Sequence, residues 1–451
     1  MDKDNPFITR TLNTNDALHG LDSVHDDCVA QRDYDEDSEC SEASSEHSPE
    51  IDAVVKQDMD KLENIFHEIG FKFRMIDRIG EGTFSTVYKA EDRHYEYYQN
   101  DWDPDFHCTS RSTSSRSSEG RQPRRKPRFV AIKKIYVTSS PMRIQNELEL
   151  LHVLRGYDSI CPLITAFRHQ DQVIAILPHF RHQDFRMFYR DMTPYHIKIY
   201  FRSLFTALAA VHKHGIIHRD IKPTNFLYDI ERKQGVLVDF GLAEREGTDS
   251  SHCMCQDTPA IQKHKIRASR AYGQPTPTGY PKNDHRGSRR ANRAGTRGFR
   301  APEVLLKCTS QTTKIDIWSA GVILLTILAQ RFPFFNSSDD IEAMIEIASI
   351  FGQRRMKNCA QLHGAVFDCT IPTIGEKGYS LEQIVQWSMS NTRPDEGDDL
   401  DLETKECVRF LERCLELDPK KRISARAALV SDFLAGAVES ESDVDELQMA
   451  E

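Results

Sequence analysis

Three short polar motifs follow one another in the middle of the chain, and no other feature restricts the possible folds as strongly. They are His218-Arg219-Asp220 with Asn225 five residues after the aspartate, then Asp239-Phe240-Gly241, and finally Ala301-Pro302-Glu303. A hydrophobic core does not require these polar residues in this order, so packing does not explain the set. Carboxylate and amide oxygens are hard ligands of the kind that magnesium prefers. The motifs therefore predict a catalytic site that holds a divalent cation.

The order of the motifs resembles the catalytic loop, the metal-binding turn and the closing tripeptide of protein kinases. The resemblance implies an α+β, bilobal protein kinase fold with a β-rich N-lobe and a helical C-lobe, and ATP and Mg²⁺ as cofactors. It also implies roles for single residues. Asp220 would accept a hydrogen bond from the substrate hydroxyl, and Lys222 would contact the transferred phosphate. Asn225 and Asp239 would bind magnesium.

The local patterns agree with a small β-rich lobe followed by a larger helical one. Two strands joined by a glycine turn are expected over Phe71 to Ala90, and a third strand over Phe129 to Ile135. Ile197, Phe201, Leu204, Leu208 and Val211 step by four and three, which predicts a helix buried on one face that leads into the catalytic loop. Further helices are expected around Thr313 to Ala329, Asp339 to Ile350, Lys405 to Leu417 and Ser424 to Leu434.

The glycine turn and the strands that follow it supply the expected nucleotide site. Gly80 and Gly82 let the backbone approach phosphates, and Lys133 places a cation at the end of a strand beneath that turn. The third glycine of the kinase motif is replaced by Ser85. By resemblance, adenine binds the carbonyl of Pro178 and the amide of Phe180. The resemblance implies a full set of Ile79, Gly80, Glu81, Gly82, Val87, Ala131, Lys133, Leu177, Pro178, Phe180 and Leu227, with Val87, Ala131 and Leu227 on the two faces of the base.

Lys133 requires a carboxylate to orient it, and the next helix offers Glu147 and Glu149. The kinase pattern selects Glu147, because it places the glutamate four residues before the second of two paired aliphatic residues. The other candidate, Glu149, is interpreted as an exposed charge on the helix.

Two further features resemble the serine/threonine-specific kinases. Lys222 stands two residues after the aspartate, and Thr296 precedes the closing tripeptide; in that group such a threonine hydroxyl links the catalytic aspartate and lysine. Glu303 and Arg422 match the ion pair that fastens the end of the activation segment, and Asp316 lies in the helix that supports the catalytic loop. These last three residues are expected to be structural.

The amino-acid composition predicts one folded domain with an acidic segment at each end and two polar insertions. Residues 1–60 are rich in Asp, Glu and Ser and are expected to form a disordered acidic arm, and residues 435–451 an acidic tail. The kinase domain is expected over residues 71–434, with polar insertions at about 92–128 and 245–293. The longest apolar stretch, Ala320 to Ala329, is far shorter than the roughly 20 residues that span a bilayer. No membrane segment is expected, and the scattered cysteines suit a reducing compartment.

Within the kinases, several segments resemble the cell division cycle 7-type, DBF-dependent serine/threonine kinases, notably the fungal ones. They are Gly295 to Leu305, Lys134 to Pro141 and Phe185 to Asp191, together with the places of the two insertions. The likeness covers roughly residues 60–435. It implies a nuclear enzyme, bound to a DBF-type activating subunit, that phosphorylates the minichromosome maintenance helicase and so promotes initiation of DNA replication. Any association with chromatin would be indirect.

Substrate preference has a local argument. In the kinase fold that the chain resembles, the stretch with Arg297 and Arg300 faces the residue after the phosphoacceptor, which implies a preference for an acidic residue or a phosphoserine there. The chain carries such sequences itself at Ser38, Ser41, Ser45, Ser440 and Ser442. These serines are either autophosphorylation sites or parts of solvated acidic tails, and the tails are the favoured interpretation.

The second insertion contains His252-Cys253-Met254-Cys255, which could supply zinc ligands. The spacing is not the common Cys-x-x-Cys, and a fourth ligand such as His264 is distant, so zinc is not the favoured interpretation. The basic runs Arg124 to Arg128 and Arg286 to Arg293 lack interleaved aromatic residues and fit nuclear import better than nucleic-acid binding.

Two other functions were weighed. An inert kinase-fold scaffold has no physical need for Lys133, Asp220, Asn225 and Asp239 together, so their joint presence argues against it. An autonomous serine/threonine kinase of another cell-cycle family is disfavoured by the inserted activation segment, which is polar enough to need a bound subunit for its order.

Overall fold

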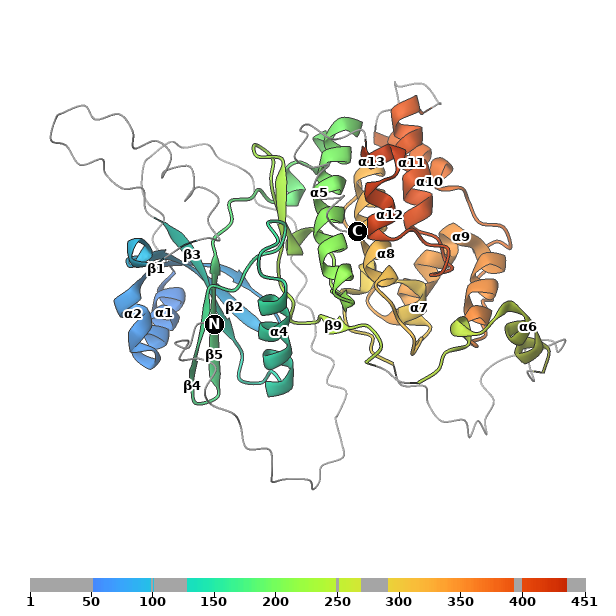
Figure 1. Cartoon of the computed structure of the whole chain (residues 1–451). Coiled ribbons are helices and arrows are strands. Elements are labelled where there is room, and N and C mark those ends of the chain that lie inside the picture. Colours follow the sequence, from blue (N-terminus) through green and yellow to red (C-terminus); the bar gives the residue numbers. More distant parts are fainter. Residues whose placement is uncertain are drawn as a thin grey trace. The chain divides into compact units, whose positions relative to one another are not determined.

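The computed structural model describes residues 52–98, 100, 128–248, 251–268, 291–392 and 400–435. An antiparallel sheet forms the N-lobe, in the order β1-β2-β3-β5-β4. Its strands are β1 (Phe73–Glu81), β2 (Ser85–Asp92), β3 (Phe129–Ile135), β4 (Thr165–His169) and β5 (Gln172–Pro178). The helix α4 (Pro141–Val153) follows β3 and belongs to the same lobe (Figure 1).

Two helices at the start of the described chain cover one face of this sheet. They are α1 (Ala53–Ile65) and α2 (His67–Lys72), and Val55, Met59 and Leu62 of α1 are buried in one core with Ile132 of β3. Asp52 caps α1 by accepting a hydrogen bond from the backbone of the first turn. The prediction of a disordered arm is therefore wrong over residues 53–60, because three apolar side chains at helical spacing bury themselves against the sheet. The folded domain begins before residue 71 for the same reason.

The C-lobe is built around two long buried helices, α5 (Pro194–Lys213) and α8 (Lys314–Leu328). Proline at the first position of α5 and the Thr193 side chain, which accepts from His196, define where that helix starts. Side chains all around α8 are buried, as expected for a run this apolar. The remaining helices are α7 (Pro302–Leu305), α9 (Asp340–Leu362), α10 (Leu381–Thr392), α11 (Leu402–Cys414), α12 (Ala425–Leu429) and α13 (Asp432–Ala435).

Short elements between α5 and α7 carry the loops of the site. They are β6 (Ile216–Ile217), paired with β9 (Glu244–Arg245), and β7 (Phe226–Asp229), paired with β8 (Gln234–Leu237). The described 3-10 turns are Tyr95–Tyr97, Phe185–Met187, Tyr189–Asp191, Pro223–Asn225, Met254–Gln256 and Arg297–Phe299.

The helices of the C-lobe depart from the prediction in their length and number. The helix predicted to end at Ile350 continues to Leu362, with a change of direction at Gly352, whose φ of 78° and close approach to Gly378 suit only glycine. The helix α10 was not predicted. None of the described helices is both long and apolar enough to cross a bilayer.

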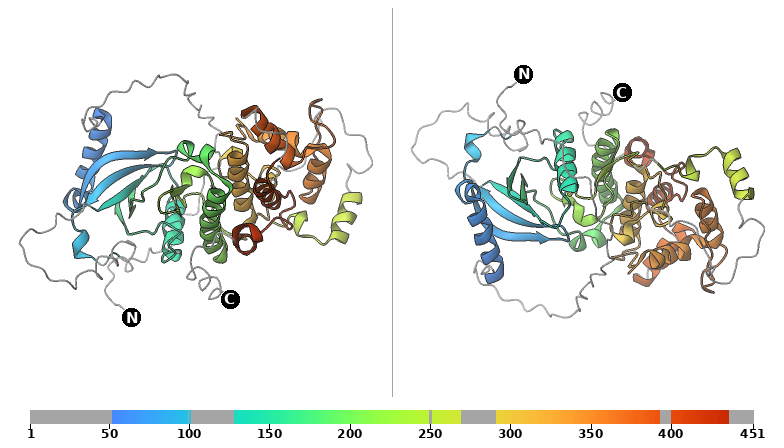
Figure 2. Two further views of the ribbon diagram at one scale, coloured as in Figure 1. Left: turned by 90° about the horizontal axis from the view of Figure 1, so that it is seen from above. Right: turned by 90° about the horizontal axis from the view of Figure 1, so that it is seen from below.

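The insertions are described only in part. Of the first, β2 ends at Asp92 and residues 101–127 lie outside the described residues. Of the second, a 3-10 turn and the helix α6 (Pro259–Ala268) are described, and α6 lies at the periphery of the C-lobe (Figure 2). The expectation that this insertion has no fold of its own is therefore wrong for its first part. The acidic serine motifs at both ends and the basic run from residue 124 to 127 lie outside the described residues.

Candidate active site

Lys133 is the centre of a buried charge network that joins the two lobes. Its Nζ lies 2.6 Å from Glu147 Oε1 on α4 and 2.8 Å from Asp239 Oδ1 in the C-lobe. Burial alone would lower the pKa of Lys133, but the two carboxylates outweigh it and raise that pKa above its usual range. Glu149, the alternative partner, is exposed and accepts from Gln145 at 2.7 Å.

The position of Asp239 follows from the turn that carries it. Its φ of 63° is unusual for a residue with a side chain, and Phe240 beside it is fully buried against His218, with ring centroids 4.8 Å apart. Burial would raise the pKa of Asp239, yet Lys133 outweighs it and lowers the pKa to about 2. Asp239 is therefore a carboxylate at neutral pH.

Helix α4 also holds the metal-binding turn through contacts that the motifs did not reveal. Arg143 Nε donates to Gly241 O at 2.6 Å, and Asn146 Nδ2 donates to Ala243 O at 2.8 Å. These bonds fix the helix that carries Glu147, the residue after Asn146, relative to the turn. A helix-face pattern could have suggested these polar positions, but not their partners nearly 100 residues away.

Asp220 lies at the centre of the catalytic loop and accepts hydrogen bonds on both oxygens. Oδ1 accepts from Thr296 N at 2.9 Å and from Thr296 Oγ1 at 2.6 Å, while Oδ2 accepts from Asn225 Nδ2 at 3.0 Å. Lys222 Nζ lies 3.0 Å from Oδ2 and 3.1 Å from Thr296 Oγ1. Burial would raise the pKa of Asp220, but Lys222 and Thr296 lower it below its usual range. The carboxylate is thus ionised and fixed in orientation.

A second aspartate, Asp316 on α8, supports the backbone of this loop. It is fully buried and accepts from His218 N at 2.9 Å and from Arg219 N at 2.8 Å. Gly295, with φ of 116°, lies so close to the Arg219 carbonyl that a Cβ would clash with it. The approach of Thr296 to Asp220 therefore depends on glycine at 295.

The buried ion pair expected from the sequence is present. Arg422 Nη1 and Nη2 lie 2.6 and 3.0 Å from the two oxygens of Glu303, and both side chains are almost completely buried. Arg422 also donates to Lys314 O and Glu416 O, at 2.8 and 2.9 Å. Because every charged end is paired, the end of the activation segment is fastened to the C-lobe core.

The pairing of β1, β2, β3 and β5 positions several of the residues that are expected to bind the nucleotide. β2 pairs Gly80 of β1 with Val87, and β3 pairs Val87 with Lys133 and Ala131 with Leu177. Gly82 N donates to Ser85 O at 2.9 Å and closes the glycine turn. Ile79 is half exposed, Glu81 is exposed, and Pro178, Phe180 and Leu227 are partly buried. The register thus places Gly80, Val87, Ala131, Lys133 and Leu177 on neighbouring strands of the sheet, while Leu227 lies on β7.

The residues fit magnesium by their donor chemistry. Asn225 uses its Nδ2 to donate to Asp220 O at 2.8 Å and to the Asp220 side chain, so its carbonyl oxygen is directed elsewhere. Asp239 uses Oδ1 for Lys133. An amide oxygen and a carboxylate oxygen thus remain as hard donors, which is the ligand pair expected for this cation.

Arginines near the substrate side form a cluster that sequence reasoning found only in part. Arg300 Nη1 and Arg293 Nη1 each lie 2.5 Å from an oxygen of Asp340, at the start of α9. Arg297 is exposed in the turn directly after Thr296. Burial and repulsion from Arg297 and Arg293 lower the pKa of Arg300, while Asp340 opposes them. We refer to Arg293, Arg297, Arg300 and Asp340 as the arginine cluster.

Arg219 of the catalytic loop has its partners within the chain. It contacts Glu244, and its Nη1 donates to Gln311 Oε1 at 2.7 Å. Glu244 also accepts from Asn292 Nδ2 at 2.8 Å. A carboxylate of the chain therefore neutralises this arginine.

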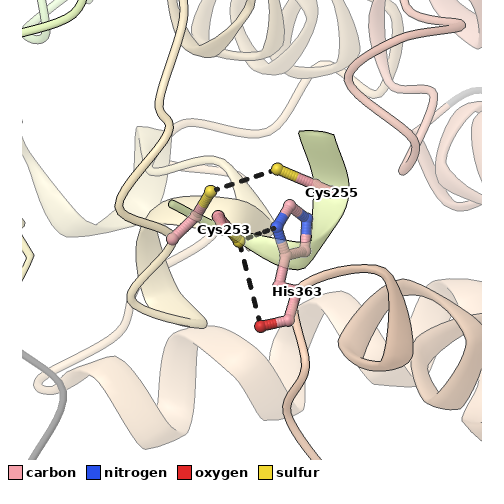
Figure 3. A group of neighbouring side chains, drawn as sticks. Cys253, Cys255 and His363 are labelled. Atoms are coloured by element: carbon pink, nitrogen blue, oxygen red, sulfur yellow. Dashed lines mark hydrogen bonds between the residues drawn. The ribbon is translucent and has the colours of Figure 1, made fainter. Parts of the chain in front are cut away.

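The cysteines of the second insertion that were considered as zinc ligands are buried against the C-lobe (Figure 3). Cys253 and Cys255 lie beside Cys308, from the loop after α7, and His363, from the end of α9, and the four ligand atoms all lie within 4.8 Å of one another. His252 instead contacts Asp257, at 2.7 Å. A set of three thiols and an imidazole has the donor chemistry to hold a metal ion.

Comparison with known proteins agrees with this geometry. The family model described as "Protein kinase domain" matches residues 118–275 and 278–434. The chain is 49% identical over 420 residues to the "Cell cycle serine/threonine-protein kinase hsk1" of Schizosaccharomyces pombe, covering 90% of this chain and 82% of that protein. It is 40% identical to the "Cell cycle protein kinase spo4" of the same organism, covering 86% and 91%. The "Cell division cycle 7-related protein kinase" of Homo sapiens is 27% identical, covering 70% and 72%.

The matched kinase domain and the identity to these relatives agree with the geometry of the site. The chain therefore belongs to the cell division cycle 7-type serine/threonine protein kinases.

Proposed function

We propose that this kinase transfers the γ-phosphate of ATP to serine or threonine residues that are followed by an acidic or phosphorylated residue. The observation that carries the proposal is the arginine cluster. Arg293 and Arg300 share the single carboxylate of Asp340, and Arg297 is exposed directly after Thr296, so three guanidinium groups face one carboxylate and the cluster keeps net positive charge. A second anion there would form charge-assisted hydrogen bonds, which are about twice as strong as neutral ones.

The catalytic residues have the arrangement that phosphoryl transfer requires. The ionised Asp220 carboxylate, held by Thr296 and Asn225, would accept the hydrogen bond of the attacking hydroxyl and orient it. Lys222 lies beside it with its charge available to the transferred phosphate, and Lys133, held by Glu147, would contact the other phosphates. Asn225 and Asp239 would hold magnesium, which neutralises phosphate charge when bound.

The biological role that we propose rests on the names of the relatives. Two of the relatives compared above are named as cell cycle kinases, and on that basis we propose that this enzyme acts in the nucleus on subunits of the minichromosome maintenance helicase and promotes replication initiation. A DBF-type activating subunit fits the long polar insertion in the activation segment, because binding of a partner can set the conformation of such a segment.

The arginine cluster makes a testable prediction about peptides. Replacing the residue after the phosphoacceptor from Asp to Ala should lower kcat/KM about 10- to 100-fold, the size expected for one or two charge-assisted hydrogen bonds. Arg297→Ala should lower kcat/KM for the Asp peptide and leave the Ala peptide nearly unchanged. Initial rates with the two peptides, taken with the activating subunit present, measure both effects.

The matched control is Arg331→Ala, which removes an exposed arginine elsewhere in the C-lobe. It should leave the ratio of the two peptides as in the wild type. Equal kcat/KM for the Asp and Ala peptides with wild-type enzyme would contradict the proposed substrate class.

A further inference from the structure

Arg143, in the first turn of α4, contacts two loops that belong to different lobes. Its Nε donates to Gly241 O at 2.6 Å, in the metal-binding turn of the C-lobe. Its guanidinium carbon lies 3.8 Å from the centre of the Phe84 ring, in the turn between β1 and β2. That turn carries Gly82 and is expected to cover the phosphates of ATP. Arg143 is outside all the kinase motifs found in the sequence, yet it joins two of them.

The guanidinium of Arg143 depends on the aromatic ring for its stabilisation. Its Nη2 is buried and has no hydrogen-bond partner among the residues that the structure describes. The negative face of an aromatic ring attracts a cation, and this attraction is strongest where water is excluded. Phe84 is 42% exposed, so core packing alone does not hold its ring. The contact between Arg143 and Phe84 therefore fixes both side chains.

The backbone carries this contact into both turns. In the glycine turn, Gly82 N donates to Ser85 O at 2.9 Å, directly after the aromatic residue. In the metal-binding turn, Ala243 N donates to Phe240 O at 3.0 Å, around the carbonyl that accepts from Arg143. Because one side chain contacts both turns, neither turn can move away without breaking a contact of Arg143.

We propose that Arg143 is a positioning residue for phosphoryl transfer, which holds the glycine turn and the metal-binding turn in the arrangement that binds ATP. This inference rests on the kinase chemistry proposed above. Arg143 would act on the two turns and not on the reacting atoms, because its guanidinium faces a carbonyl and an aromatic ring. Without it, the turns would adopt this arrangement only part of the time, and the apparent affinity for ATP would fall in proportion.

Two variants separate the contacts of Arg143. Arg143→Gln places an amide nitrogen where Nε lies and removes the cation, whereas Arg143→Lys keeps a cation near the ring and places a methylene where Nε lies. Hydrogen exchange of the full chain without nucleotide, measured by mass spectrometry, reports on the hydrogen-bonded amides of Gly82 and Ala243. Arg143→Ala should speed up both about tenfold, the size expected for one buried cation–π contact or one charge-assisted hydrogen bond. Arg143→Gln should affect Gly82 most, and Arg143→Lys should affect Ala243 most.

A kinetic cycle tests whether Arg143 and Phe84 act as one unit. Phe84→Leu should raise the KM for ATP about tenfold in the wild-type chain, but less than about twofold in Arg143→Ala, where the ring has no cation to bind. Phe84→Tyr keeps an aromatic face and should leave this KM within about twofold of the wild type. The kcat at saturating ATP should change less than the KM, because bound nucleotide orders the turns. The matched control is Arg155→Ala, an exposed arginine directly after α4, which should change neither the exchange nor the KM.

Exchange at Gly82 and Ala243 that is the same in Arg143→Ala as in the wild type would overturn the proposal. Independent effects of Arg143→Ala and Phe84→Leu on the KM for ATP would equally overturn it. If Arg143→Ala folds poorly, the exposed Phe84 still decides, because a KM of Phe84→Leu equal to that of the wild type contradicts the coupling. An inactive wild-type chain would contradict the proposed function instead, and the exchange measurement, made without nucleotide, then still tests Arg143.

Discussion

Asp220→Asn should lower kcat by about 10³-fold, within the range of 10² to 10⁴ that positioned acid–base groups contribute. The substitution keeps the size of the side chain but removes the charge that orients the substrate hydroxyl and pairs with Lys222. Its amide nitrogen would also face another donor, either Asn225 Nδ2 or Thr296. The KM for ATP should change little, because Asp220 is not among the expected nucleotide contacts. Steady-state kinetics with saturating peptide measure both constants.

The control for this experiment is Asp191→Asn, an exposed aspartate before α5. It should leave kcat within about twofold of the wild type, as surface substitutions away from a site usually do. The unfolding midpoint of Asp220→Asn should be recorded alongside the kinetics, so that loss of fold is recognised. A folded Asp220→Asn protein with kcat within tenfold of the wild type would contradict the role given to Asp220.

Glu303→Ala should destabilise the chain by about 3 to 5 kcal/mol, because it leaves the Arg422 guanidinium buried without its carboxylate. The same cost applies to Arg422→Met, which leaves Glu303 buried and unpaired. The double variant should be more stable than the sum of the single effects, since it removes both charges together. Urea unfolding of the four proteins gives the coupling energy between the two residues.

An exposed pair provides the comparison. Lys357 and Glu376 lie 3.1 Å apart on the surface, and Glu376→Ala should cost less than about 1 kcal/mol. If Glu303→Ala costs no more than Glu376→Ala, the buried pair does not fasten the activation segment as described.

Much of the site could be predicted because its residues sit at short, fixed spacings. Asp220, Asn225 and Asp239 stand within a 20-residue stretch, and the hairpin of β7 and β8 between Asn225 and Asp239 returns the chain, so that Val238 N donates to Asn225 O. The choice of Glu147 over Glu149 rested on the kinase pattern of a glutamate before paired aliphatic residues, and the structure pairs Glu147 with Lys133. The short motifs and their order were therefore sufficient to predict these catalytic and metal-binding residues.

The rest depended on contacts between residues far apart in the chain. Cys253 and His363 are 110 residues apart, and Arg293 and Asp340 are 47 apart, so no local pattern joins them. The error at α1 has a different cause. Val55, Met59 and Leu62 have helical spacing, but the acidic composition of the preceding residues concealed this short amphipathic stripe.

The measurement that tests the central claim most directly is phosphorylation of an acidic-serine peptide from a helicase tail, with magnesium and ATP. Wild type and Asp220→Asn are each assayed with and without a purified DBF-type subunit. The account predicts strong activity only for wild type with the subunit. Equal activity of wild type without the subunit would contradict activator dependence, and absence of activity in all four reactions would contradict the proposed substrate and partner together.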